Sequence, residues 1–155
     1  MGAVERFLDA ADAAGVRADV RRFPDGTKTA ADAARAIGCD MAQIVKSLVF
    51  VVDERPVIAF TSGSNRVDPG KLAAVAGGSR ARRATPEEAR AATGFAVGGT
   101  PPFGYPEPVP AYLDPDLAAF EEVWAAAGTP DSVFPMSPEA LERVTGAVRA
   151  DFTEG

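Results

Sequence analysis

The sequence predicts an α/β (α+β) fold with a mixed central β-sheet flanked by short helices. Short runs of β-branched and apolar residues alternate with short helical segments along the chain, a pattern typical of sheets covered by helices. With 155 residues and an apolar fraction of 46%, the chain is long enough to build one hydrophobic core. We therefore expect a single domain over residues 1–155.

Helices are expected where a capping residue precedes apolar residues at helical spacing. The pairs Thr29–Asp32 and Thr85–Glu88 have the spacing of a capping box, in which each side chain bonds the backbone N–H of the other residue. Proline occupies the first position of three expected helices, where its missing N–H is tolerated. In chain order, the expected helices span residues 4–14, 29–38, 68–76, 85–94 and 137–145, with one further turn at 41–44.

Strands are expected where β-branched and apolar residues run together between turn residues. The runs 48–52 and 57–60 are apolar on both faces, which is typical of central, buried strands. The charged residues and the proline between them predict a hairpin. Arg82 and Arg83 are assigned to a short strand between two helices. The remaining strands are expected over residues 16–23, 109–113, 123–126, 132–136 and 147–152.

Composition excludes several classes of chemistry. The chain has no histidine and a single cysteine, Cys39, so catalytic relays through histidine and zinc sites built on histidine or several thiolates are excluded. The lone cysteine also excludes an internal disulfide and suits a reducing cytoplasm, where we expect the protein. No apolar run approaches the roughly 20 residues that cross a bilayer. The net charge of −6 argues against binding along a nucleic-acid backbone, but it allows contact with one end.

Lys46 is the first candidate for a functional residue. It lies within the run IVKSLVF, residues 44–50, where a half-buried ammonium is costly to desolvate unless it meets an anion. A lysine that extends from a strand end to water explains the same pattern, so spacing alone leaves both interpretations open. As a functional group, Lys46 would bind a phosphate, a carboxylate or a developing oxyanion, or act as a base with a lowered pKa.

The second candidate is a glycine–proline loop, GGTPPFG, at residues 98–104. Glycines let backbone N–H groups approach a ligand closely, and the prolines fix the direction of the chain. The N–H groups of Gly98 and Gly99 are therefore candidate donors to an oxyanion. Thr100, Pro101 and Pro102 would shape the same surface. A purely structural turn also explains this motif.

Further residues are candidates for lining the same pocket. Hydroxyl groups without a histidine partner are poor nucleophiles, so those after the second central strand are interpreted as groups that orient substrate or water. This segment comprises Thr61, Ser62, Gly63 and Ser64. Asp131 follows a proline in a turn, where aspartate is usually structural; the alternative is that it recognises an amino group. The arginines near residues 17–22 and 80–83 are interpreted as solvated surface charge.

Four segments resemble a known family in their order and spacing. They are TAADAARAIGCDMAQIVKSLVF (29–50), SGSNRVDPGKLAAVAGG (62–78), ATPEEARAATGFAVGGTPPFG (84–104) and SPEALERVTGA (137–147). These segments resemble the YbaK/EbsC family of aminoacyl-tRNA deacylases, also called the prolyl-tRNA synthetase editing-domain or INS-like family. The resemblance covers nearly the whole chain, from about residue 29 to 153.

The resemblance implies a partly closed sheet with the active site beside the lysine and the glycine–proline loop. The family lysine falls on Lys46, and the family loop falls on residues 98–102. Family pockets also use the segment 61–64 and the turn that holds Asp131. Free-standing members hydrolyse the ester between a wrong amino acid and the 3′ end of tRNA. Pocket size decides which amino acid is removed, and side chains expected to shape it include Phe23 and Phe50.

The resemblance therefore implies a trans-editing hydrolase that deacylates mischarged tRNA, with tRNA(Pro) carrying a small wrong amino acid as the expected substrate. Because an aminoacyl ester is already activated, substrate-assisted hydrolysis without a metal or cofactor is expected, with Gly98 or Gly99 binding the oxyanion and Lys46 holding the ribose-phosphate or sharing its charge. The expected partner is the acceptor end of aminoacyl-tRNA, with a transient prolyl-tRNA synthetase contact allowed, and neither DNA nor a membrane. The alternatives are a non-catalytic module that binds an amino acid or aminoacyl end, and a hydrolase of other small aminoacyl esters or amides.

Overall fold

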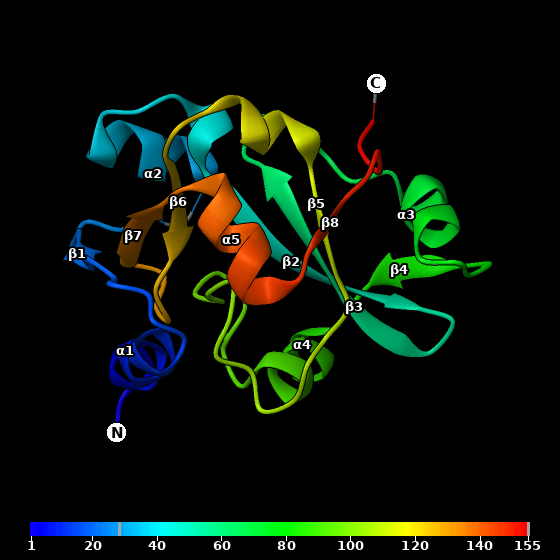
Figure 1. Cartoon of the computed structure of the whole chain (residues 1–155), viewed down its shortest axis with the longest axis horizontal. Coiled ribbons are helices and arrows are strands. Elements are labelled where there is room, and N and C mark those ends of the chain that lie inside the picture. The colour runs from blue at the N-terminus through cyan, green and yellow to red at the C-terminus, as the bar shows by residue number, and fades with distance from the viewer. Residues whose placement is uncertain (28, 155) are drawn as a thin grey trace.

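The computed structural model describes residues 1–27 and 29–154, which form two β-sheets and five α-helices (Figure 1). The larger sheet has the strand order β4-β2-β3-β5-β8, and the smaller sheet has the order β1-β7-β6. The mixed α/β class is confirmed. The strands are β1 Arg21–Arg22, β2 Val45–Val52, β3 Arg55–Ser62, β4 Ala81–Arg83, β5 Ala111–Leu113, β6 Val123–Ala126, β7 Ser132–Met136 and β8 Val148–Arg149.

Helix boundaries follow the capping residues that predicted them. The Thr29 hydroxyl accepts a hydrogen bond from Asp32 N at 3.0 Å, and Thr85 and Glu88 form a complete capping box. Among the described residues, no helix is long and apolar enough to cross a membrane. The helices are α1 Ala3–Ala13, α2 Ala30–Ile37, α3 Pro69–Val75, α4 Pro86–Thr93 and α5 Pro138–Thr145, with 3₁₀ helices η1 Met41–Gln43 and η2 Pro115–Ala119.

The hairpin of β2 and β3 forms the centre of the larger sheet, as their two-sided apolarity predicted. The two strands pair antiparallel over their whole length, with Lys46 directly opposite Thr61. Their turn places Asp53 and Glu54 at φ values of 47° and 74°, the left-handed region that two-residue hairpin turns require. On its far side, β3 pairs in parallel with β5 and β5 in parallel with β8, so the sheet is mixed.

The smaller sheet is a feature that the apolar runs do not reveal. The strand expected over residues 16–23 is only Arg21–Arg22, and it pairs with β7 rather than with the central hairpin. A single parallel bridge, Ile44 to Trp124, connects the start of β2 to β6. The two sheets meet at this bridge, and aromatic side chains pack in a separate core cluster. Phe7 of α1 contacts Phe103 and Phe134 at ring-centroid distances of 5.1 and 4.7 Å.

The C-terminal segment lies along the chain that precedes α3. Phe152 is fully buried, and its carbonyl oxygen accepts a hydrogen bond from Asp68 N at 2.8 Å. Glu154 N donates to Arg66 O at 2.9 Å, and Thr153 bridges Val67 antiparallel. The strand expected over residues 147–152 is shorter, Val148–Arg149, because the chain leaves β5 to make these contacts (red in Figure 1).

Candidate active site

A cavity of about 420 Å³ lies along the edge of β2, in the gap between β4 and β6. The strand β4 pairs with β2 only over Phe50–Val52, and β6 reaches β2 only through the Ile44–Trp124 bridge. Between these contacts, no other described strand pairs with this edge of β2. The stretch between these two contacts, residues 45–49, forms one wall of the cavity.

The other walls come from four separate parts of the chain. Small and apolar side chains of α2 and α4 close two sides, and the glycine–proline loop closes a third. The smaller sheet supplies the fourth through β6 and β7. No carboxylate lines the cavity in the part of the chain that the structure describes. Its charged groups there are Lys46 and Arg83, and its other polar side chains are Thr27, Thr29, Ser47, Thr100 and Ser132.

Lys46 enters the cavity as a half-buried cation. Its Nζ donates a hydrogen bond to Asn65 O at 2.5 Å. Burial is the largest cause that lowers the pKa of Lys46, followed by the charges of Arg83 and Arg66, and Asp114 opposes them. A cation that is partly desolvated and close to other cations favours an incoming anion.

The residue that accepts the hydrogen bond of Lys46, Asn65, is held in place by a buried carboxylate. Asp114 is 1% exposed and accepts hydrogen bonds from Ser62 N at 3.0 Å and Asn65 Nδ2 at 2.8 Å. Asp116 accepts a second bond from Asn65 Nδ2, also at 2.8 Å. These contacts fix Asn65, whose carbonyl oxygen faces Lys46. The sequence analysis missed Asn65 and Asp114; the available signal was an acidic residue directly after the strand that ends at Leu113.

The two glycines of the loop have different surroundings. Gly98 lines the cavity with φ at 91°, and its N–H has no acceptor among the described residues. The N–H of Gly99 instead donates to Ala96 O at 3.1 Å. The Thr100 hydroxyl donates to the same oxygen at 3.1 Å. The loop is therefore folded over Ala96, and of its two leading glycines only Gly98 faces the cavity.

The predicted segment 61–64 lies outside the cavity lining. Thr61 is opposite Lys46 in the ladder but fully buried, and its hydroxyl donates to Ala59 O at 3.1 Å. The Ser62 hydroxyl donates to Ala42 O at 2.8 Å. A Cβ at Gly63 would lie only 2.4 Å from the carbonyl oxygen of Met41. The segment packs against η1, and its groups are used in holding the fold. Ser64 does not line the cavity either.

The turn that holds Asp131 lines the cavity through Pro130 and Ser132, but Asp131 itself is not part of the lining. The Asp131 carboxylate accepts a hydrogen bond from the Thr129 hydroxyl at 2.6 Å, and its carbonyl oxygen accepts one from Phe23 N at 2.8 Å. Phe23 packs against the cluster that contains Trp124. Neither Asp131 nor Phe23 lines the cavity.

Three further predicted residues also lie elsewhere. Phe50 is buried with the cluster around Leu72, and Pro101 O accepts a hydrogen bond from the Tyr105 hydroxyl at 2.7 Å. Pro102 lines a separate cavity of about 270 Å³. Of the residues that the sequence analysis selected, the structure brings Lys46, Gly98 and Thr100 together.

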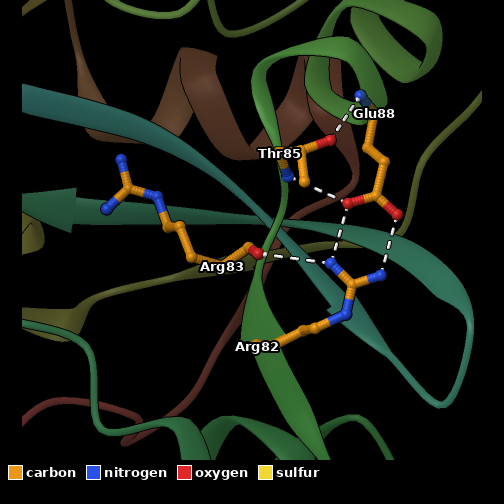
Figure 2. Close-up of polar contacts among 4 residues, drawn as sticks. All are labelled: Arg82, Arg83, Thr85 and Glu88. Carbon is orange, nitrogen blue, oxygen red and sulfur yellow. Dashed lines mark hydrogen bonds and ion pairs between the residues drawn. The ribbon is translucent and has the colours of Figure 1, made fainter.

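Neighbouring arginines of β4 point to opposite sides of the strand (Figure 2). Arg82 donates two hydrogen bonds to the Glu88 carboxylate, at 2.7 and 2.8 Å. These bonds, followed by the hydrogen bond from Thr85 N, lower the pKa of Glu88 to about 2. Arg83 lines the cavity, with its guanidinium 5.8 Å from the centre of the Phe50 ring. The alternation of side chains along a strand separates the two residues.

One hydroxyl of the cavity lining has no partner. The hydroxyls of Thr27, Thr100 and Ser132 donate to backbone oxygens, and that of Thr29 accepts from its own helix. In the described part of the chain, Ser47 Oγ is the buried side-chain polar atom that has no hydrogen-bond partner. Such a group costs free energy on folding.

Comparison with known proteins assigns the family. Residues 24–144 match the aminoacyl-tRNA editing domain. The chain belongs to the aminoacyl-tRNA editing family. The matched range contains every residue that lines the larger cavity, from Thr27 to Val133. The predicted relationship to the YbaK/EbsC deacylases is confirmed.

Three relatives place the chain more closely. The crystal structure of a proposed trans-editing enzyme for prolyl-tRNA synthetase is 46% identical, with a TM-score of 0.94 over 100% of this chain and 99% of that one. YwhH of Bacillus subtilis, an uncharacterised protein, is 32% identical over 79% of this chain and 78% of its own. EbsC of Enterococcus faecalis, a proposed Cys-tRNA(Pro)/Cys-tRNA(Cys) deacylase, is 28% identical over 81% of this chain and 77% of its own.

Proposed function

We propose that the protein is a trans-editing deacylase that hydrolyses the ester of mischarged tRNA, with tRNA(Pro) carrying a small wrong amino acid as its substrate. The observation that carries this proposal is that Lys46 and Gly98 line one cavity and that, among the described residues, the Gly98 N–H has no acceptor. The cavity volume of about 420 Å³ lies within the range of small-ligand sites. The names of the solved relative and of EbsC support tRNA(Pro) and a transient contact with prolyl-tRNA synthetase.

The chemistry follows from which groups are free. The N–H of Gly98 stabilises the oxyanion of the tetrahedral intermediate, since the N–H of Gly99 is already bonded to Ala96 O. Lys46 holds the terminal ribose-phosphate or shares the charge of the oxyanion. Apolar walls strengthen both interactions because they lower the local dielectric.

The activating base comes from the substrate in this mechanism. The described cavity lining contains no carboxylate, and the chain contains no histidine, so no such side chain is placed there to deprotonate water. The neighbouring ribose hydroxyl or the amino group of the substrate takes that role. We propose that no metal takes part, since the same lining offers no carboxylate, imidazole or thiolate ligand.

Deacylation of a tRNA(Pro) panel tests the proposal. The panel carries alanine, cysteine, serine or threonine, with correctly charged Pro-tRNA(Pro) as the control substrate. We expect the wild type to clear at least one mischarged species and to spare Pro-tRNA(Pro). Lys46→Ala should reduce that rate by at least about 100-fold, the scale of losing a preorganised electrostatic contact. Lys71→Ala is the matched control, because Lys71 lies outside the cavity and donates to Thr153 O.

The same deacylation assay also tests the role of Lys46, the mechanism without a metal and the alternative of a non-catalytic module. A rate that Lys46→Ala leaves unchanged would refute the role given to the lysine. A rate that falls with EDTA would refute the mechanism without a metal. Absence of turnover across the panel, with a protein shown to be folded, would favour a module that binds the aminoacyl end without hydrolysing it.

A further inference from the structure

Two cations line the cavity and a third lies near one of them, although the chain has a net charge of −6. Lys46 and Arg83 both line the cavity. Arg66 directly follows Asn65, which accepts the hydrogen bond of Lys46 Nζ. Both guanidinium groups lie near enough to Lys46 to lower its pKa. In the part of the chain that the structure describes, neither Arg66 nor Arg83 forms an ion pair with a carboxylate.

Arg83 lines the cavity, whereas its neighbour Arg82 forms an ion pair with Glu88. In the ladder between β2 and β4, Arg83 faces Phe50 and Arg82 faces Val51. Phe50 and Lys46 are four residues apart on β2, so their side chains share a face, and Arg83 shares that face with them. Arg82 lies on the other face, where Glu88 binds it through both guanidinium NH₂ groups (Figure 2).

The carboxylate near these cations, Asp114, already accepts hydrogen bonds from other groups. Asp114 is the acidic residue that raises the pKa of Lys46, but it is buried and accepts bonds from Ser62 N and Asn65 Nδ2. Like charges held close together without a counterion repel one another. An anion from outside would therefore relieve the repulsion among the three cations.

We infer that Arg83 and Arg66 bind phosphate groups of the single-stranded 3′ end of an RNA, next to the ester that enters the cavity. The inference rests on the proposed function, which places that ester at Lys46 and Gly98. Arg83 is paired with Phe50, four residues or about 13 Å along β2 from Lys46 at roughly 3.3 Å per residue. Long side chains at these two positions reach a ligand that extends along the strand, as linked phosphates do. A guanidinium suits this task because it donates paired hydrogen bonds to phosphate oxygens.

Binding of an unacylated short RNA with a single-stranded 3′ end tests this inference without requiring turnover. Fluorescence anisotropy would compare the wild type with Arg83→Gln, Arg66→Gln and the control Arg82→Gln at about 50 and 200 mM salt. The control removes the same charge from the adjacent position of the same strand. We expect Arg83→Gln and Arg66→Gln each to weaken binding about tenfold. Each should also make the plot of the logarithm of the association constant against the logarithm of the salt concentration less steep. The slope should change by about 0.7, the value for one phosphate contact with a single strand.

The control variant should bind the RNA within about twofold of the wild type, a small change beside the tenfold loss expected for Arg83→Gln and Arg66→Gln. Equal losses in Arg82→Gln and Arg83→Gln would overturn the inference, because they would reflect overall charge rather than a site. Unchanged binding by Arg83→Gln would overturn it as well. Thermal unfolding of each variant establishes that the compared proteins are folded.

A second measurement separates this inference from the proposed function. A 3′-aminoacyl-adenosine carries the ester but no phosphate, so Arg83→Gln should slow its hydrolysis far less than it slows deacylation of mischarged tRNA. With mischarged tRNA, the same variant should raise KM by a larger factor than it lowers kcat. Equal loss on both substrates would overturn the phosphate role. Binding of RNA that depends on Arg83, in a wild type that hydrolyses neither ester, would support the phosphate site and refute the deacylase proposal.

Discussion

Replacing Gly99 by alanine should displace the glycine–proline loop, whereas the same change at Gly98 should not. A Cβ at Gly99 would lie 2.7 Å from Thr129 Cα, 2.8 Å from Thr129 C and 2.9 Å from Gly128 O. Ordinary contact begins at 3.4 Å, so the loop or the turn must move by about 0.7 Å. All three atoms belong to the backbone, which cannot rotate away as a side chain does.

The two substitutions differ in size and in kind. Overpacking of this type costs about 1–3 kcal/mol, and at about 2–4 °C per kcal/mol the Tm of Gly99→Ala should fall by about 2–12 °C. A Cβ at Gly98 has only Pro130 Cγ near it, at 3.9 Å. An alanine at the positive φ of position 98 costs about 1–2 kcal/mol of stability. About 0.4–1 kcal/mol of this cost is offset because alanine restricts the unfolded chain more than glycine does.

The rates should separate the two variants further. Displacement of the loop moves the N–H of Gly98, and a misplacement of about 1 Å can cost up to 10²-fold in rate. Thermal unfolding and single-turnover deacylation of both variants would measure these effects. Wild-type Tm and rate in Gly99→Ala would refute the close approach of the two backbones. A larger loss of stability in Gly98→Ala than in Gly99→Ala would refute the comparison.

Two further predictions concern neighbouring positions of β2. Burial holds the pKa of Lys46 below the ordinary 10.5, so the unfolded chain binds more protons between the two values and stability should rise with pH across that interval. In Lys46→Met this rise in stability should be missing. Denaturant unfolding of both proteins from pH 7 to 10.5 measures it. Identical pH profiles of stability in the wild type and the variant would contradict the burial of the ammonium. Ser47→Ala removes a buried hydroxyl that lacks a partner and should raise stability by about 1–3 kcal/mol. A lowered Tm would show that this hydroxyl is bonded.

Local chemistry in the sequence predicted the helices and the first two members of the candidate site. Capping residues set where α2 and α4 begin, because their bonds reach only three residues. Lys46 stood out as a charge in an apolar run, and Gly98 as the start of a rigid loop. Each of these signals is contained within a few residues, so no knowledge of the fold was required to detect it.

The rest of the site depends on how distant segments pack. The hydroxyls of Thr61 and Ser62 follow a central strand, which suggested a cleft, but backbone oxygens nearby accept their bonds. Asp114 and Asn65 are far apart in the sequence and meet only because β5 pairs with β3. The availability of Arg83 follows from the register between β2 and β4, which a run of arginines does not reveal.

The attachment of the C-terminal segment has a consequence for the order in which the protein matures during translation. Arg66 is synthesised early, but its backbone carbonyl is bonded by Glu154 and its neighbours by Phe152 and Thr153. Because synthesis proceeds from the N-terminus, a nascent chain can form the central hairpin while the segment beside Lys46 still lacks its support. The end of the cavity that we assign to RNA therefore lacks this support until residues 152–154 have left the ribosome.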